Sequence, residues 1–460
     1  MKASHRLRPQ FDNPNLVPSA GLAPALVLAQ NAGFHQCAEQ ALTVDSPNAA
    51  LKAGCVVAGM LAGADTVDGL GLLRAGATAR AFTGVRAPST LGTFLRSFTF
   101  GHVRQLDRVA GATVAGLVRQ VPDLLAGHDE HDEVVMVDVD DTVRQVYGYA
   151  KQAAGYGYTG VKGLNVQVVT VSTEQSAPLV LDARCRKGAT ASGSGSAAAL
   201  GRALAVLDRA GARAMVVVRA DSAFYRADFV AAAVARGAWF SVTAPMNKAV
   251  TRAVASIDEG AWTAIAYPQA VWEQDLDHPG GGYWVSDAAV AQVPFVAFSS
   301  KKKTQVPCHL VVRRVKRLAP RSADGTNEQG ELFDTWRHHA FITNTAWDAV
   351  HADACHRDHA IVEQVIAELK DGPLAHMPSG SYAANAAWTV LATIAFNLAR
   401  ALAVAAGHTT ARWATVRRTI INVPATLANT AHTCYLHMPT SWPWAGGWLK
   451  AWHTAQPAGP

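Results

Sequence analysis

The stretch Val134-Val135-Met136-Val137-Asp138-Val139-Asp140-Asp141-Thr142 decides the fold. Its first half is apolar and rich in valine, which is typical of a short buried strand, and the strand ends in a group of carboxylates. Acids that follow a strand are also common as turn residues or helix caps. The meaning of these acids therefore depends on the elements predicted around them.

Strands and helices alternate on the carboxyl side of this stretch. Two further strands come first, and the glycine-rich breaks between them suit tight turns. Three strands followed by helix, strand, helix and strand is the order of the RNase H-like fold, an α/β fold with helices on the faces of a mixed sheet. The predicted elements are strands 164–172 and 177–181, helix 194–209, strand 214–219, helix 226–235 and strand 239–243.

The residues outside this predicted core have different sequence patterns. The N-terminal part predicts helices joined by Gly and Pro breaks, and a later stretch of short β-like runs predicts an insertion. We expect a helical N-terminal domain at 1–127, a first core part at 128–245, a β-rich insertion at 246–336, a second core part at 337–410 and an irregular, Trp-rich C-terminal tail at 411–460.

Two of the predicted strands end in acid. The first is followed by Asp138, Asp140 and Asp141, and the fourth by Asp221. The carboxyl ends of strands in an α/β sheet face a shared crevice. Carboxylates in such a crevice form an oxygen site suited to Mg²⁺ or Mn²⁺. Two such ions, about 3.5–4 Å apart, suit phosphoryl transfer because they serve the attacking and the leaving oxygen.

A third carboxylate comes from the predicted helix at 361–370. Its apolar residues make one face of an amphipathic helix. Glu363 and Lys370 are seven residues apart, about two turns, so they share another face and could hold a metal ion and a neighbouring phosphate. An exposed helix with mixed charges is an equally good interpretation of this pattern.

The distribution of charge favours a polyanionic partner. The chain has 41 basic and 35 acidic residues, a net charge of +6, and no acidic residue follows Asp371. A second basic cluster begins at Lys301, Lys302 and Lys303. Such clusters suit DNA, because phosphate contacts release counterions. A solvated surface explains the charges equally well.

The sequence predicts neither a membrane span nor a zinc site. Six dispersed cysteines indicate reduced thiols in a cytoplasmic protein. The most apolar segment, 383–406, contains Asn385, Asn397 and Arg400, which favours a buried helix. The His351, Cys355, His356 and His359 group lacks the second pair of ligands that closed zinc sites usually recruit.

Several motifs resemble those of bacterial insertion-sequence DDE transposases, particularly the branch with a β-rich insertion before the catalytic glutamate. They are Asp140-Asp141-Thr142, Arg219-Ala220-Asp221-Ser222-Ala223-Phe224-Tyr225 and Glu363 with Lys370. Further matches follow in the same order along about residues 15 to 410. They are Val146 to Gln152, Gly157 to Gly160, His339 to Asn344 and Ala384 to Trp388.

The resemblance implies a transposase in which Asp140, Asp221 and Glu363 hold two Mg²⁺ or Mn²⁺ ions. Asp138 and Asp141 remain rivals for the first position. The family usually has Tyr and Arg seven and four residues before the glutamate, and here His356 and His359 stand there. We expect these histidines, Arg357, Lys370 and the lysines at 301–303 to contact DNA.

The resemblance implies that the partners are the terminal inverted repeats and target DNA, which the helical N-terminal domain at 1–127 would bind as a DNA-binding domain. A homodimer would bridge the DNA ends. The implied location is the cytoplasm of a bacterium, at the nucleoid. The implied reaction is cleavage at the element ends, followed by attack of the freed 3′-hydroxyl on target DNA. Two alternatives remain open. One is a metal-dependent nuclease without strand transfer, and the other is a DNA-binding protein whose catalysis has decayed.

Overall fold

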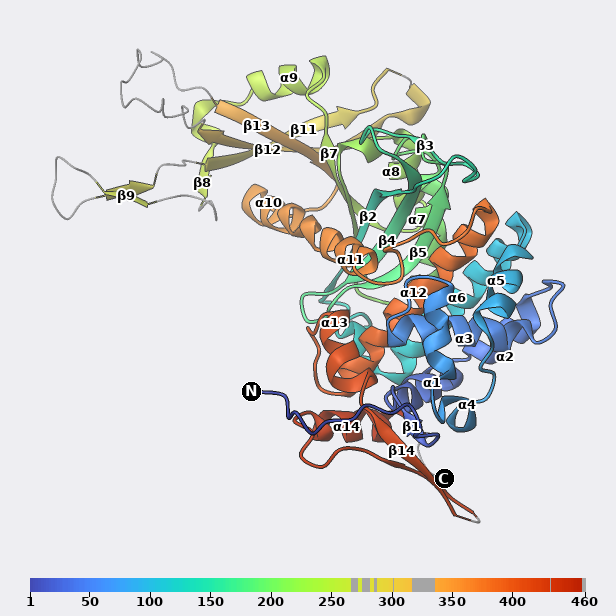
Figure 1. Ribbon diagram of the computed structural model, residues 1–460. Helices are drawn as coiled ribbons and strands as arrows, with labels where there is room; N and C mark the ends of the chain where they lie inside the picture. The colour runs from blue at the N-terminus through green and yellow to red at the C-terminus, as the bar shows by residue number, and fades with distance from the viewer. Residues whose placement is uncertain are drawn as a thin grey trace, which may run out of the picture.

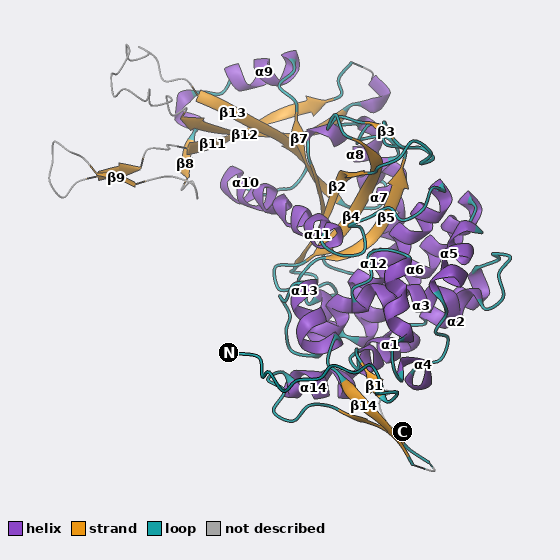
Figure 2. Ribbon diagram, in the orientation of Figure 1, coloured by secondary structure: helices purple, strands orange, loops and turns teal. Residues whose placement is uncertain are grey.

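In the computed structural model, one large mixed sheet lies beside a layer of helices (Figures 1 and 2). The structure describes residues 1–265, 272–274, 282–284, 288–300, 302–316, 336–430 and 432–456. Within these residues, ten strands belong to the large sheet, in which β3 and β5 both pair with β4.

The central five strands have the RNase H-like arrangement that the sequence predicts. Their spatial order is β5-β4-β2-β6-β7, with β2 antiparallel to β4, β4 antiparallel to β5, and β2, β6 and β7 mutually parallel. Connecting helices join the parallel strands, as crossovers require. The elements are β2 (Val134–Gln145), β4 (Lys162–Ser172), β5 (Leu179–Arg186), α7 (Ser196–Ala210), β6 (Met215–Ala220), α8 (Ala227–Val234) and β7 (Trp239–Ala244).

Most strands of the β-rich insertion extend this sheet, while β9 and β10 form a separate two-stranded sheet. β13 pairs antiparallel with β7, and β12, β11 and β8 follow outward from it. The predicted all-β segment also begins with a helix, α9. The elements from residue 246 onward are α9 (Lys248–Ala255), β8 (Thr263–Ile265), β9 (Trp272–Gln274), β10 (Gly282–Trp284), β11 (Ala288–Ala297), β12 (Val306–Lys316) and β13 (Trp336–Thr343). The short strand β3 (Gly155–Tyr156) belongs to the core, where it pairs with β4.

Two helices lie against the face of the sheet that carries Asp138 and Asp140. α10 (Ala349–Arg357) contacts β11 and β12, and α11 (Ile361–Lys370) contacts β2 (Figure 1). α11 spans the residues that its amphipathic pattern predicts, and its apolar residues are buried. The fold thus brings the predicted Glu helix to the strand that carries the first aspartates.

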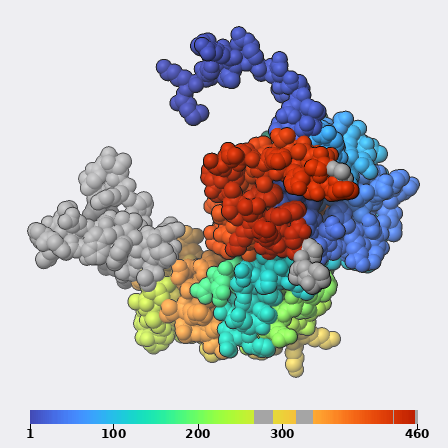
Figure 3. All heavy atoms as spheres, turned by 90° about the horizontal axis from the view of Figure 1, so that it is seen from below, coloured from blue at the N-terminus to red at the C-terminus, as the bar shows by residue number. Residues whose placement is uncertain are grey.

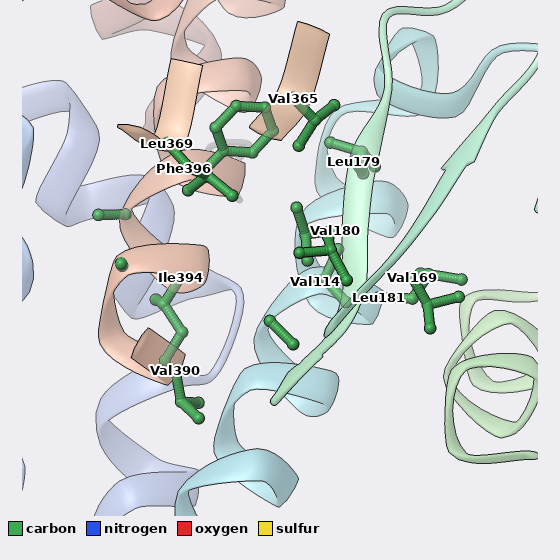
Figure 4. Close-up of a cluster of buried hydrophobic side chains, with 14 of the residues drawn as sticks. Val114, Val169, Leu179, Val180, Leu181, Val365, Leu369, Val390, Ile394 and Phe396 are labelled. Atoms are coloured by element: carbon green, nitrogen blue, oxygen red, sulfur yellow. The ribbon is translucent and has the colours of Figure 1, made fainter. Parts of the chain in front are cut away.

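The N-terminal helices share one core with the second part of the chain. α12 is long and apolar enough to cross a membrane, but 94% of its apolar window is buried inside the protein. It contacts the N-terminal helices as well as β5, and Phe396 of α12 lies with Leu369 of α11 in the same cluster (Figure 4). The helices are α1 (Leu22–Asn31), α2 (Phe34–Ala41), α3 (Ala49–Ala62), α4 (Thr78–Ala81), α5 (Pro88–Arg96), α6 (Phe100–Gln120) and α12 (Tyr382–Ala405).

The C-terminal segment has regular structure where an irregular tail was predicted. Its strands form a small sheet with β1. Figure 3 shows the C-terminal segment, in red, packed beside the N-terminal helices, while the first residues of the chain, in dark blue, project away from the body. Within this segment Trp448 is buried against the rest of the protein. The elements are β1 (Leu16–Val17), α13 (Trp413–Val416), β14 (Ala425–Asn429), β15 (Cys434–His437) and α14 (Ala445–Ala455).

Candidate active site

The three rival aspartates on β2 point to opposite faces of the sheet. Side chains alternate along a strand, so Asp138 and Asp140 share one face and Asp141 lies on the other. Strand β2 continues to Gln145, because its ladder with β4 runs on through Gln145 and Gly163. The acids therefore lie within the strand, and each has a different environment.

Asp138 is fully buried, and both oxygens of its carboxylate accept hydrogen bonds. Arg219 on β6 donates from Nε to Oδ1 at 2.7 Å and from Nη2 to Oδ2 at 2.8 Å. The Nδ1 atom of His359 lies 2.9 Å from the same Oδ1. Burial acts to raise the pKa of Asp138, but the His359 and Arg219 interactions outweigh it and lower the pKa. This aspartate is a structural anion that holds Arg219 and His359 in place.

Asp141 is bound on the opposite face. Its Oδ2 accepts hydrogen bonds from Arg186 at 2.5 Å and from Asn165 at 2.6 Å. Arg186 also donates to the backbone carbonyls of the turn that leads into α7, including Ser192 and Ser194. Asp141 therefore fixes β5 and that turn to β2.

Asp140 has no side-chain hydrogen-bond partner in the described part of the chain. Its Oδ1 accepts from the backbone N–H of Asp141 at 2.7 Å. Burial raises the pKa of Asp140 to about 6, and the negative charges of Asp221 and Asp141 act in the same direction. Of the three rivals, Asp140 alone has a carboxylate that no described side chain binds, and the charges of Asp221 and Asp141 lie close to it.

Asp221 lies directly beside Asp140. The parallel ladder pairs Val139 with Ala220, so the next residue on each strand stands at the same level. Asp221 is exposed and its side chain accepts from the backbone N–H of Ala223 at 2.9 Å. Burial of its carboxyl raises its pKa, and the charge of Asp141 adds to this effect. The predicted first and second acids thus form a like-charged pair.

The predicted third acid, Glu363, lies on α11, which contacts β2, but its carboxylate is not gathered with the Asp140–Asp221 pair. His359 is anchored on Asp138, and Glu363 follows one helical turn later, about 6 Å along α11. Glu363 is exposed on α11. Within the described residues, no three His, Cys, Asp or Glu side chains stand close enough to hold a metal ion.

Lys370 is the last residue of α11. Burial lowers the pKa of Lys370, the nearby Arg144 adds to this effect, and the charge of Asp140 opposes it. The ammonium group therefore lies within electrostatic reach of Asp140.

His356 does not fit its predicted role as a phosphate contact. Its ring stacks on Phe341 with centroids 4.1 Å apart. Nδ1 lies 2.8 Å from the Ser241 hydroxyl and Nε2 lies 3.0 Å from the Thr243 hydroxyl, so both ring nitrogens are occupied. Because the hydrogen-bonding atoms face the sheet, this histidine is a packing residue in the structure.

His359 and Arg357 are held by acids. The Nδ1 atom of His359 is committed to Asp138, and the Nε of Arg357 donates to Asp353 at 3.0 Å. Lys302 and Lys303 are exposed at the turn between β11 and β12, while the predicted contact Lys301 lies outside the described residues. Only the two described lysines of that run present free surface charge.

Acidification should destabilise the fold through His356. Burial lowers the pKa of His356 to about 3, and the charges of His359, Arg219 and Arg313 act in the same direction. The unfolded chain binds a proton near pH 6.5 and the folded chain does not. Stability is thus fully present above about pH 6.5 and falls by about 1.4 kcal/mol per pH unit below it.

This prediction can be checked by urea unfolding of the wild-type and His356→Gln proteins between pH 7 and 4. Gln keeps donor and acceptor groups for Ser241 and Thr243 but cannot titrate. The stability difference between the two proteins should shift in favour of the variant as pH falls. His453→Gln, a change at an exposed histidine, serves as the control. A difference that does not depend on pH would contradict the buried, neutral state of His356.

Two site residues were not singled out from the sequence. Arg219 binds Asp138, and Tyr158 places its hydroxyl 3.5 Å from the backbone carbonyl of Asp141. A signal for Arg219 was present, because an arginine in an apolar strand requires a buried acid as its partner. Tyr158 carried no comparable signal, since it lies in a loop.

Comparisons with known proteins give a family match and distant similarity to solved structures. The family model described as transposase DDE domain group 1 matches residues 57–458. No protein of curated function matches. Among solved structures the chain is similar to "Cryo-EM structure of piggyBac transposase synaptic complex with hairpin DNA (SNHP)". The sequence identity is 8%, the TM-score is 0.41, and the match covers 87% of this chain and 79% of that one.

Proposed function

The chain belongs to the transposase DDE domain group 1 family, and from this premise we propose that it mobilises an insertion sequence by cutting and rejoining DNA. The proposed reaction is hydrolysis at the element ends, followed by attack of each freed 3′-hydroxyl on target DNA. A bacterial cytoplasm, with the protein at the nucleoid, is the proposed setting.

The observation that carries the proposal is the like-charged pair of Asp140 and Asp221. The pKa of Asp140 is raised to about 6, because burial of its carboxyl and the negative charges of Asp221 and Asp141 outweigh the opposing charge of His359. Carboxylate oxygens in such a pair are the ligands that Mg²⁺ and Mn²⁺ prefer. The residues therefore fit a divalent metal site, and we propose Glu363 as the further ligand. When bound, two such ions would activate the attacking oxygen and stabilise the leaving oxygen.

The surrounding side chains have supporting roles in this proposal. Arg219 and Asp138 fix β2 to β6, which holds Asp140 and Asp221 at the same level. The Asp138–His359 contact fixes the start of α11 and hence the position of Glu363. The charge of Asp140 acts on the pKa of Lys370, so the Lys370 ammonium lies near the proposed site and is placed to bind a DNA phosphate beside the reacting bond. His359 is retained as a proposed second phosphate contact through its other ring nitrogen.

Two assays separate this function from its alternatives. Supercoiled plasmid that carries the element ends should be cleaved with Mg²⁺ and remain intact without it, whereas a decayed DNA-binding protein would leave it intact in both cases. A pre-cleaved end mixed with target plasmid should then give joined products. A nuclease without strand transfer would give only nicks. We propose a homodimer as the assembly, because two ends must be joined together.

Neutralising Lys302 and Lys303 should weaken DNA binding at every sequence. Each phosphate contact that is lost lowers the slope of log K against log salt by about 0.9. The measurement is a salt titration of duplex binding by a variant with both lysines changed to Gln. Lys248 and Arg252, which are exposed on α9, provide a control variant with the same loss of charge. Equal slopes in the wild-type and Lys302/Lys303 proteins would show that this turn does not contact DNA.

A further inference from the structure

The loop between β2 and β4 exposes four tyrosines within twelve residues. Tyr147 is 78% exposed, Tyr149 103%, Tyr156 68% and Tyr158 66%. The whole chain has nine tyrosines, so this concentration is local. Tyrosine rings bury large apolar areas when they help a fold, and these four contribute little to the core. Residues 147–158 are called the tyrosine loop below.

The backbone of the tyrosine loop is held in place although its rings are exposed. The backbone N–H of Gln152 donates to Gly380, and the side chain of Gln152 accepts from the N–H of Tyr382, both at 3.0 Å. Ala153 accepts from the N–H of Gly188 at 3.0 Å. Lys151 donates to the carbonyl of Met377. The loop is thus fastened to the start of α12 and to the end of β5, which gives the rings a preorganised support.

The tyrosine loop also lies beside the proposed catalytic carboxylates. The Tyr158 hydroxyl donates to the backbone carbonyl of Asp141, the residue after Asp140, at 3.5 Å. A phenol has an ordinary pKa of about 10, well above neutral pH. The phenol therefore stays protonated as a hydrogen-bond donor. At the other end of the loop, the Lys162 ammonium lies 5.6 Å from the centroid of the Tyr149 ring. The loop combines exposed rings, a phenolic donor and a cation next to the site of the reaction.

We propose that the tyrosine loop binds unpaired nucleotides next to the bond that is cut, with its rings stacked on their bases. An aromatic ring can stack only on a base whose face is open, which occurs in a single strand or a melted end. Lys162 supplies a positive charge for the backbone of the same strand. The inference rests on the proposed function, since the DNA must lie at Asp140 and Asp221 for the loop to reach it.

The test uses the full-length Asp140→Asn protein, which should bind DNA without cutting it. The probes are a 20-base-pair duplex, chosen at roughly two helical turns, and the same duplex with a five-thymidine single-stranded tail. Stacking contributes about 1–3 kcal/mol per base, so the tail should tighten binding by about tenfold or more. Tyr149→Ala combined with Tyr156→Ala should remove this gain. The matched Phe variants, which keep the rings, should retain it.

Each outcome has a distinct meaning. If the protein binds the duplex but the tail adds nothing, the tyrosine loop does not bind bases, and the proposed function stands. If neither probe binds in any variant, the proposed function fails together with the inference. If the Ala variants keep the tail effect, or change the association state measured by sedimentation instead, the rings serve another purpose and the inference is overturned. Loss of the tail effect in the Phe variants would likewise contradict stacking.

Discussion

Asp140→Asn is expected to abolish DNA cleavage and strand transfer while the protein still folds and binds DNA. The substitution removes a metal-ligand charge and keeps the size of the side chain, and Asn can still accept from the N–H of Asp141. Metal assistance supplies several kcal/mol of transition-state stabilisation. At 1.36 kcal/mol per factor of ten, the expected loss in rate is about a thousandfold or more. Initial rates on a plasmid substrate measure it.

The same substitution should stabilise the metal-free protein at neutral pH. The pKa of Asp140 is about 6 in the folded chain and about 3.9 in a free side chain, a difference worth at most about 3 kcal/mol. Solvent at the partly exposed carboxylate reduces this value. Because the folded pKa is raised, the stabilisation is complete above about pH 6 and disappears as pH falls toward 4. Thermal unfolding in EDTA at pH 7.5 and 4 gives the comparison.

The neighbouring acids provide the controls for this prediction. Asp221→Asn and Glu363→Gln should also lose cleavage and retain binding. Asp138→Asn should instead weaken the fold, because it breaks the buried pair with Arg219. Normal cleavage by Asp140→Asn would show that the first catalytic acid lies elsewhere.

Arg219→Gln should destabilise the protein by about 3–5 kcal/mol, because it leaves the buried Asp138 carboxylate without its cation. The side chains of the pair are 3% and 0% exposed. By contrast, Arg226→Gln breaks the exposed pair with Asp228 and should cost no more than about 1 kcal/mol. Urea unfolding at pH 7.5 measures both variants.

A double replacement separates the loss of a partner from the loss of the pair. Asp138→Leu with Arg219→Met removes both charges, and apolar replacements of buried ion pairs are often close to neutral. The double variant should therefore be more stable than Arg219→Gln. Equal stabilities of wild type and Arg219→Gln would contradict the role of this pair in holding β2 to β6.

The elements that the sequence predicts well are those whose pattern is determined locally. α11 begins and ends at the predicted residues, because its apolar face repeats with the helical period over the whole segment. Strand β2 was predicted to end at Asp140 and in fact runs to Gln145, since its later residues are polar and its continuation depends on hydrogen bonds to β4. Cross-strand pairing leaves no trace in the sequence of one strand.

The sequence pattern does not predict which segments distant in the sequence pack against each other. The insertion joins the core sheet because β12 pairs with β13, which in turn pairs with β7. The β-periodicity on either side of the predicted domain boundary does not reveal that one sheet continues across it. Similarly, the apolar composition of α12 predicts burial but does not reveal its neighbours. These partners are set by packing between segments hundreds of residues apart.

The choice of the first acid shows the same limit within the candidate site. Asp138, Asp140 and Asp141 are chemically alike in the sequence, and their roles differ only through Arg219, Arg186 and the alternation of β2. His356 was predicted to bind phosphate from its position before Glu363, but Ser241 and Thr243 occupy its ring. The spacing of the motifs predicts where the candidate site lies along the chain. The hydrogen-bond partners determine which of its side chains remain available to bind a metal ion or DNA.

The most direct test of the metal site is a change of metal preference at Asp140. A cysteine thiolate is a softer ligand than a carboxylate and favours Mn²⁺ over Mg²⁺. Asp140→Cys should be inactive in Mg²⁺ and recover part of its cleavage activity in Mn²⁺, so the ratio of the two rates should exceed that of the wild type. Cysteine at the structural position Asp138 should show no such recovery. A wild-type ratio at Asp140→Cys, or recovery at Asp138→Cys alone, would contradict the assignment of Asp140 as the metal-binding carboxylate.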